Sequence, residues 1–266
     1  LKKTDVIATG NADSYQFIYG GQSAHETSIR FVNNQIGLNS WTGSAYEFNW
    51  TTTRQFRDTS AWFHLVVAFD STQGTNTNRL KVYINGEQET PTTVAYPDQN
   101  LDTRMNLSGL AQYIGRYYTT TSGEYLDYNG YMAEFNWLDG TAAAPSSFGE
   151  TNSATGQWIP KEYSGSYGTN GFYLKFVSGA IGTDSSGEGN NQTVGNIANY
   201  DVVTDSPTNN FCTYDGLIGS DPLVVRSFGN LYAPLRANTS YPGHNRVSGT
   251  MRIPTSGKWY WEIRYQ

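Results

Sequence analysis

Cysteine, charged residues and long apolar runs are all scarce in this sequence. Cys212 is the only cysteine, so neither an intrachain disulfide nor a cysteine-rich zinc site is available, which suits synthesis in a reducing cytoplasm. Charged residues make up 15% of the chain, the formal net charge is -6 and there is no basic run. We therefore expect no nucleic-acid partner. No apolar run reaches the ~18 residues of a membrane span and no signal segment opens the chain, so we expect no membrane insertion.

Glycine and aromatic residues are abundant instead. The chain has 28 Gly and 20 Tyr, and aromatics reach 15% of 266 residues. No stretch has the periodicity of an amphipathic helix of three turns. This balance is typical of short β-strands joined by Gly, Asn, Ser and Thr turns.

The clearest strand pair lies between residues 62 and 86. Residues 65–69 and 80–84 each place an apolar side chain at every second position, and the polar loop "DSTQGTNTN" separates them. The turn dipeptide Asn85-Gly86 follows. This pattern predicts two antiparallel strands.

Further strands are predicted on both sides of this pair. Residues 130–140 alternate with period 2 and are expected to form one strand. At least six short strands within about 140 residues indicate a sandwich or a barrel. The other candidate segments are "YQFIYGG" (15–21), "SIRFVNNQIGLNSW" (28–41), "AYEFNW" (45–50) and "AQYIGRYY" (111–118).

The order of these segments resembles that of concanavalin A-like lectin and laminin-G-like domains. The resemblance rests on "WFHLVVAFD", "RLKVYING", "YIG" at 113–115 and "GYMAEFNWLDG". It implies an all-β fold, an antiparallel two-sheet jelly-roll sandwich, over residues 1–145.

Residues 146–209 are rich in Gly, Ser and Thr, but their aromatic residues predict an ordered connector packed on the first domain. The segments "TGQWIPKEYSGSYGTNGFYLKF", "GTDSSGEGNN" and "DVVTDSPTNNF" make up much of the stretch 156–210. With them, this stretch resembles a connector of bacteriophage structural proteins that leads into a SPRY-like domain. By that likeness, residues 210–266 begin a partial second β-sandwich with "SGKWYWEI" as an early strand. We expect the natural chain to extend before Leu1 and beyond Gln266, and Trp259 and Trp261 to be covered by residues 211–255 or by a neighbouring subunit.

The lectin-like resemblance implies sugar binding through exposed aromatic rings with polar neighbours. The tyrosines around the segment "TTTSGE" are the preferred candidates for sugar binding, because that segment is predicted to be a polar loop tip. For all the candidates the alternative is that they pack in the core. These candidates are Tyr117, Tyr118, Tyr125 and Tyr128, together with Trp41 and Trp50.

The resemblance also implies calcium, which such domains hold through loop oxygens. Asp70 and Asp139 are the first candidates, with Asp127 and Asp184 behind them. The alternative is that these residues stabilise tight turns.

Catalytic motifs are missing from the sequence. The glucanase branch of this fold carries Glu-x-Asp-x-Glu along one strand, whereas Glu134 and Glu262 stand alone. The three histidines, His25, His64 and His244, are accompanied by no G-x-S-x-G elbow. We therefore expect no enzymatic activity.

Our hypothesis is a non-enzymatic protein on the exterior of a bacteriophage particle, in its capsid, tail or fibre, made in the host cytoplasm. It would form a homo-oligomer, contact other virion proteins and bind a cell-surface glycan. One alternative is a purely structural decoration or fibre protein whose lectin-like face lies in a subunit interface. A second alternative is a polysaccharide-degrading glycoside hydrolase.

Overall fold

The computed structural model describes residues 1–5, 15–21, 26–105, 107–119, 123–214, 231, 248–251, 253 and 255–263. Within them every pairing of named strands is antiparallel. The only helices there are the short 3-10 segments Asn76–Asn78, Pro145–Ser147 and Asn199–Asp201. No helix in this part of the chain is long and apolar enough to cross a membrane. The prediction of an all-β antiparallel fold is confirmed.

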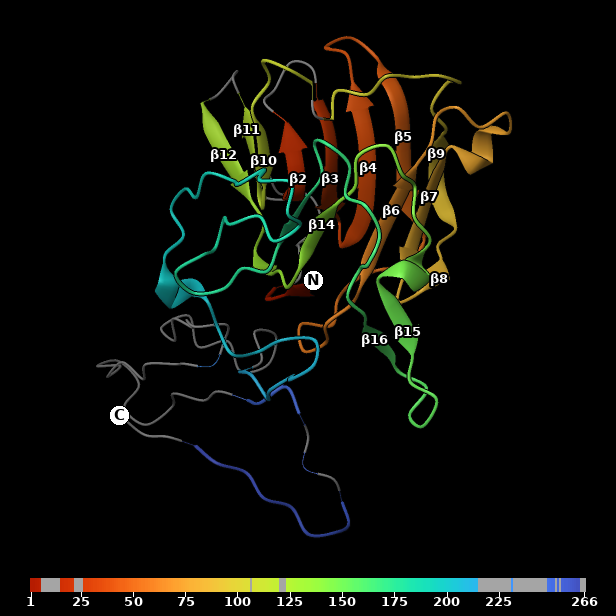
Figure 1. The fold of residues 1–266 in the computed structure, drawn as a ribbon. Helices are drawn as coiled ribbons and strands as arrows, with labels where there is room; N and C mark the ends of the chain where they lie inside the picture. Colours follow the sequence, from red (N-terminus) through yellow and green to blue (C-terminus); the bar gives the residue numbers. More distant parts are fainter. Residues whose placement is uncertain are drawn as a thin grey trace, which may run out of the picture.

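The largest layer is a six-stranded sheet in the order β10-β2-β3-β4-β5-β9 (Figure 1). The turn between β3 and β4 is Asn33-Asn34, in which both residues have positive φ, +49° and +65°. Asn tolerates this left-handed conformation, and such turns match the twist of the strands they join. The six strands are Gln112–Ile114 (β10), Tyr15–Gly21 (β2), Glu26–Val32 (β3), Gln35–Trp41 (β4), Tyr46–Thr52 (β5) and Pro91–Ala95 (β9).

A second sheet contains β6 (Leu65–Phe69), β7 (Leu80–Ile84) and β8 (Glu87–Gln88). Leu65 pairs with Ile84 and Phe69 with Leu80, so the strand pair predicted from alternation is confirmed. The apolar side chains of β7 join those of β2 to β5 in one buried cluster. The core therefore lies between the two sheets, as in a sandwich.

Smaller two-stranded sheets complete the described structure. They are β1 (Lys2–Lys3) with β13 (Gly130–Tyr131), β11 (Arg116–Thr119) with β12 (Glu124–Asp127), β14 (Phe135–Trp137) with β17 (Phe172–Leu174), and β15 (Gly149–Thr151) with β16 (Trp158–Pro160).

Two predicted strands are each broken in the structure. Residues 130–140 contain β13 and β14 rather than one strand, because Glu134 has a φ of +56° and interrupts the extended backbone. Gly115, with a φ of +75°, likewise separates β10 from β11. Strand β9 was not expected from the sequence. It begins at Pro91 and forms the edge of the sheet, where a residue without an N–H is tolerated.

Residues of the connector contact the sandwich at several points. Trp158 Nε1 donates to His64 Nδ1 at 3.0 Å, and the two rings are stacked. The connector strand β17 pairs with β14. Lys2 Nζ lies 2.7 Å from Asp205 Oδ2, and both side chains are buried. The connector is thus anchored by a ring stack, a strand pairing and an ion pair, while the boundaries at 145 and 209 stay predictions.

The C-terminal segment is described only in part. Residues 215–230 and 232–247 lie outside the described residues, and Tyr214 forms a bridge with Gly249. Trp259 and Trp261 are 60% and 63% exposed. Most of residues 211–255, which are expected to cover these two rings, lie outside the described residues, so that cover stays a prediction. Cover by a neighbouring subunit and the SPRY-like assignment both stay predictions.

Candidate functional site

Two of the six aromatic residues expected to bind sugar belong to the core. Trp50 is 1% exposed, because it shares the inward face of β5 with Phe48. Tyr128 stacks on Phe31 with 6.1 Å between ring centroids, and its hydroxyl donates to the Lys2 carbonyl oxygen at 2.8 Å. Burial raises the pKa of Tyr128 far above its usual range. Neither ring offers a free face to a sugar, so these two assignments are corrected.

The opposite face of the six-stranded sheet carries polar and aromatic side chains, and we call this face the outer strip. Ser28 and Arg30 alternate along β3 with the core residues Ile29 and Phe31, so they point away from the core. The outer strip is formed by Tyr15 and Phe17 of β2, Glu26, Ser28 and Arg30 of β3, and Asn39 and Trp41 of β4, with Tyr46 and Tyr117 packed beside them.

A hydrogen-bond network joins the polar residues of the outer strip. Ser28 Oγ donates to Asn39 Oδ1 at 2.7 Å. Arg30 Nη1 donates to Ser28 Oγ at 3.1 Å and to Glu26 Oε1 at 3.4 Å. Asn39 Nδ2 donates to the same Glu26 oxygen at 3.5 Å. These side chains are largely buried, and the network holds them in fixed positions.

Aromatic rings flank one side of this network. The Arg30 guanidinium carbon lies 5.0 Å from the centroid of the Tyr15 ring and 5.6 Å from that of Phe17. Tyr117 stacks on Phe17 with 4.5 Å between centroids. Gly20 allows this approach, because a Cβ at that position would lie 3.2 Å from Tyr117 Cδ2. Phe17 is 3% exposed beneath Tyr117, whereas Tyr15 is 40% exposed, so the Tyr15 ring beside the guanidinium is the one suited to contact with a sugar ring.

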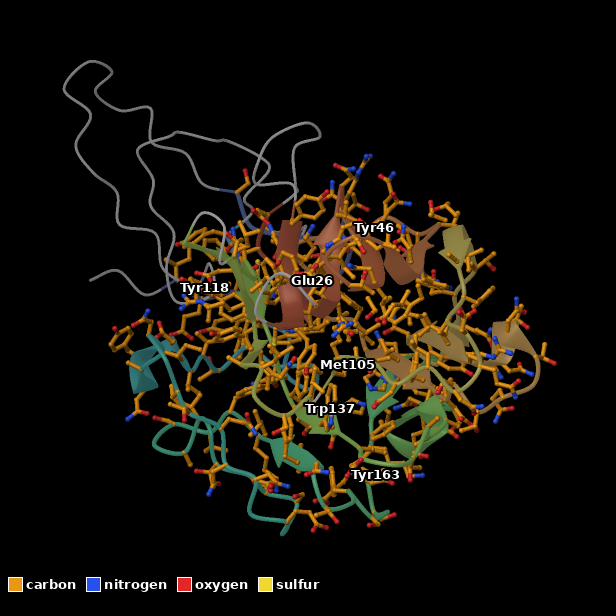
Figure 2. All side chains as sticks on the ribbon, turned by 90° about the horizontal axis from the view of Figure 1, so that it is seen from above. Glu26, Tyr46, Met105, Tyr118, Trp137 and Tyr163 are labelled. Carbon is orange, nitrogen blue, oxygen red and sulfur yellow. The ribbon has the colours of Figure 1, made fainter. Side chains whose placement is uncertain are left out.

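Trp41 and Tyr46 mark the other side of the outer strip. Their rings meet edge to face with 4.8 Å between centroids, and Tyr46 is 53% exposed. Figure 2 shows Glu26 and Tyr46 on the side of the molecule that the six-stranded sheet forms, with Tyr163 at the opposite side and Met105 and Trp137 between them. Sequence reasoning missed Tyr46, although its place at the start of an alternating segment could have indicated it.

The predicted tyrosine loop is a hairpin in the described residues. Tyr117 and Tyr118 lie on β11, and Tyr118 pairs with Tyr125 of β12. Arg116 Nε lies 2.6 Å from Asp127 Oδ1 across the hairpin. These tyrosines are therefore strand residues rather than residues of a loop tip, while residues 120–122 of that segment lie outside the described part.

The calcium candidates are engaged in local hydrogen bonds. Asp70 Oδ1 accepts from Thr72 Oγ1 at 2.6 Å, and Gln73 Nε2 donates to Asp70 Oδ2 at 2.6 Å. These hydrogen bonds, of which the one from Thr72 has the largest effect, hold the pKa of Asp70 below its usual value. Asp139 Oδ2 accepts from the side-chain amide of Asn170 at 2.8 Å. Both carboxylates act as turn or loop acceptors here, and calcium binding stays a prediction.

Asp184 is likewise a loop acceptor. It takes hydrogen bonds from the backbone N–H groups of Tyr173, Ser186 and Asn190 at 2.8 to 2.9 Å. Its pKa falls to about 2: although burial itself raises it, these hydrogen bonds outweigh that effect. Among the described residues, no group of three or more His, Cys, Asp and Glu side chains is arranged to hold a metal ion.

The catalytic candidates are dispersed. Glu134 lies at the break between β13 and β14, and Glu262 accepts from the Tyr260 hydroxyl at 3.2 Å. His64 Nδ1 is occupied by the Trp158 indole. His25 and His244 lie outside the described residues.

The described structure therefore defines an antiparallel β-sandwich domain with a polar and aromatic outer face. Residues 6–146 match the family model Laminin_G_3, described as Concanavalin A-like lectin/glucanases superfamily. The match covers more than half of the 266 residues, and the chain belongs to this superfamily. The resemblance to concanavalin A-like lectin and laminin-G-like domains is thus confirmed. No curated protein and no solved structure matches the chain.

Proposed function

We propose that this protein binds carbohydrate through its outer strip, as a non-enzymatic component of the exterior of a bacteriophage particle. The observation that carries the proposal is that exposed aromatic rings, Tyr15 on one side and Tyr46, which packs on Trp41, on the other, flank a fixed network of polar side chains. Sugars are recognised by ring stacking together with hydrogen bonds to their hydroxyls. Membership of a lectin and glucanase superfamily supports the same ligand class.

Binding without cleavage is part of the proposal. Glycoside hydrolases place two carboxyl groups on either side of the scissile bond. Glu26 is the one carboxylate among the residues that define the outer strip, and Arg30 and Asn39 contact its Oε1. Because an arginine and an amide donate hydrogen bonds to that oxygen, Glu26 suits the role of a fixed hydrogen-bond acceptor.

The placement on a virus particle rests on the likeness of residues 156–210 to a connector of bacteriophage structural proteins. A single shallow sugar site binds weakly, because stacking and hydroxyl hydrogen bonds are each modest. Many copies on one particle raise the apparent affinity through effective concentration. A homo-oligomer with other virion proteins as partners fits this need.

The test is a glycan array together with whole-host-cell binding, using the full chain displayed in many copies on beads. We expect wild-type binding to fall strongly in Trp41→Ala and Tyr46→Ala. Tyr200→Ala is the matched control, because Tyr200 is 69% exposed and lies on the connector away from the outer strip. Blank results in both assays would contradict the proposal, as would an equal loss in Tyr200→Ala.

A structural role without sugar is the second candidate. The exposure of Trp259 and Trp261 favours this structural role, because exposed apolar side chains of this size commonly mark a contact with another protein subunit. It predicts self-association of the chain that Trp259→Ser and Trp261→Ser weaken. Sedimentation velocity over a concentration series measures this, and a monomer at every concentration would count against it.

A further inference from the structure

We propose that Glu26 and Arg30 make the outer strip selective for neutral sugars with two adjacent free hydroxyls, over uronic or sulfated sugars. This inference rests on the carbohydrate-binding function proposed above. It concerns which sugar is bound and which atoms select it.

Two buried polar atoms of this pair have no hydrogen-bond partner. They are Glu26 Oε2 and Arg30 Nε. Glu26 is 8% exposed, and its other oxygen, Oε1, already accepts from Arg30 Nη1 and Asn39 Nδ2. A buried polar atom that is left unpaired destabilises the folded chain. Both atoms are closed to solvent in this structure, so a ligand pairs them once the side chains that cover them shift; the Tyr15 ring against the Arg30 guanidinium is 40% exposed and can move in this way.

The chemistry of the two atoms defines the ligand. A carboxylate oxygen only accepts hydrogen bonds and a guanidinium N–H only donates them. A hydroxyl does both, so one hydroxyl can donate to Glu26 Oε2 while its neighbour on the sugar ring accepts from Arg30 Nε. The ring of Tyr15, which is 40% exposed, lies beside the same guanidinium, where it can contact the carbon face of that sugar.

Acidic sugars fit this pair poorly. A carboxylate or sulfate has no proton to donate to Glu26 Oε2 and would face its negative charge. Arg30 does not offset that repulsion fully, because its Nη1 already interacts with Glu26. The net charge of -6 adds to the repulsion of anionic polymers.

The first experiment measures wild-type protein by saturation-transfer NMR against methyl hexopyranosides, their monodeoxy analogues and the corresponding methyl uronates. We expect removal of either engaged hydroxyl to weaken binding about tenfold, the worth of one hydrogen bond to a charged group. We expect the uronates to bind at least as weakly as the deoxy sugars.

The second experiment uses Glu26→Gln and Arg30→Lys, each checked for an intact fold by circular dichroism. Glu26→Gln replaces a pure acceptor with an amide, and Arg30→Lys removes the Nε donor. We expect each variant to lose most of the discrimination between hexopyranoside and deoxy analogue. Glu150→Gln, an exposed carboxylate on β15, is the matched control and should bind like wild type.

The outcomes separate the two proposals. If neutral sugars bind through Trp41 and Tyr46 but ignore the deoxy changes and both variants, this inference is overturned and the proposed function stands. A preference for uronates also overturns the inference alone. If no sugar binds, both proposals fail, and the unpaired atoms then point to a protein partner on the same face.

Discussion

Replacement of Gly86 by alanine tests how firmly the connector packs on the sandwich. Gly86 follows β7 in the Asn85-Gly86 turn with a φ of +84°, and a Cβ there would overlap the Trp158 ring. Trp158 in turn donates its indole N–H to His64. The variant Gly86→Ala thus combines backbone strain with a steric clash against a connector residue.

The two contributions have different sizes and can be separated. A left-handed conformation costs alanine about 1–2 kcal/mol, of which ~0.4–1 kcal/mol is returned by the stiffer unfolded chain. The clash adds about 1–3 kcal/mol. Gly109→Ala has the strain alone, because its φ is +82° and nothing lies within 4 Å of the added Cβ. Gly74→Ala has neither penalty.

Urea unfolding of the three variants gives their free energies of unfolding. Thermal melts provide a check, because each kcal/mol of lost stability lowers the melting temperature by roughly 2–4 °C. We expect Gly86→Ala to be less stable than Gly109→Ala by about 1–3 kcal/mol, and this difference to disappear in a Trp158→Ala background. If Gly86→Ala and Gly109→Ala are equally stable, or if Trp158→Ala changes nothing, the packing argument is refuted.

The remaining predictions concern buried charge, pH and metal. Asp205→Ala leaves the buried Lys2 ammonium without its carboxylate. We expect the free energy of unfolding, measured in urea, to fall by about 3–5 kcal/mol, and the double variant Asp205→Ala/Lys2→Met to regain much of this loss. Burial lowers the pKa of His64 from 6.5 to about 4, so as the pH falls the imidazole is protonated in the unfolded chain before it is protonated in the folded one. The free energy of unfolding should therefore fall by up to about 3 kcal/mol between pH 6.5 and pH 4, and His64→Gln should remove this contribution. Asp70 and Asp139 serve as loop acceptors; if they also hold calcium, as the family resemblance implies, calcium should raise the melting temperature and Asp70→Asn should abolish that rise, whereas an unchanged melting temperature in calcium and in EDTA assigns both residues to turn stabilisation alone.

The candidate site could be anticipated only in part. Trp41 and Tyr117 were expected from the sequence and do lie on or beside the outer strip. Trp50 was expected there and is a core residue. Alternation separates the two faces of a strand but does not say which face turns toward the second sheet. Glu26 and Arg30 were missed, although they share one face of β3 with Ser28 while Ile29 and Phe31 occupy the other.

Local sequence specifies many of the strands and several of their turns. Period-2 patterns and turn residues act over a few residues, so residues 65–69 and 80–84 and the Asn33-Asn34 turn specify their own geometry. The breaks at Glu134 and Gly115 show the limit of that reasoning, since a single residue with positive φ ended a strand whose pattern continued.

Which distant residues meet depends on the packing of the whole fold. The indole of Trp158 on His64, the ion pair of Lys2 with Asp205, and the stack of Tyr117 on Phe17 join positions 94, 203 and 100 residues apart. No local pattern encodes such pairs, because they depend on how the sheets pack and on which face each strand buries. The unpaired atoms of Glu26 and Arg30 belong to the same class, since their burial is a property of the assembled face rather than of the segment that carries them.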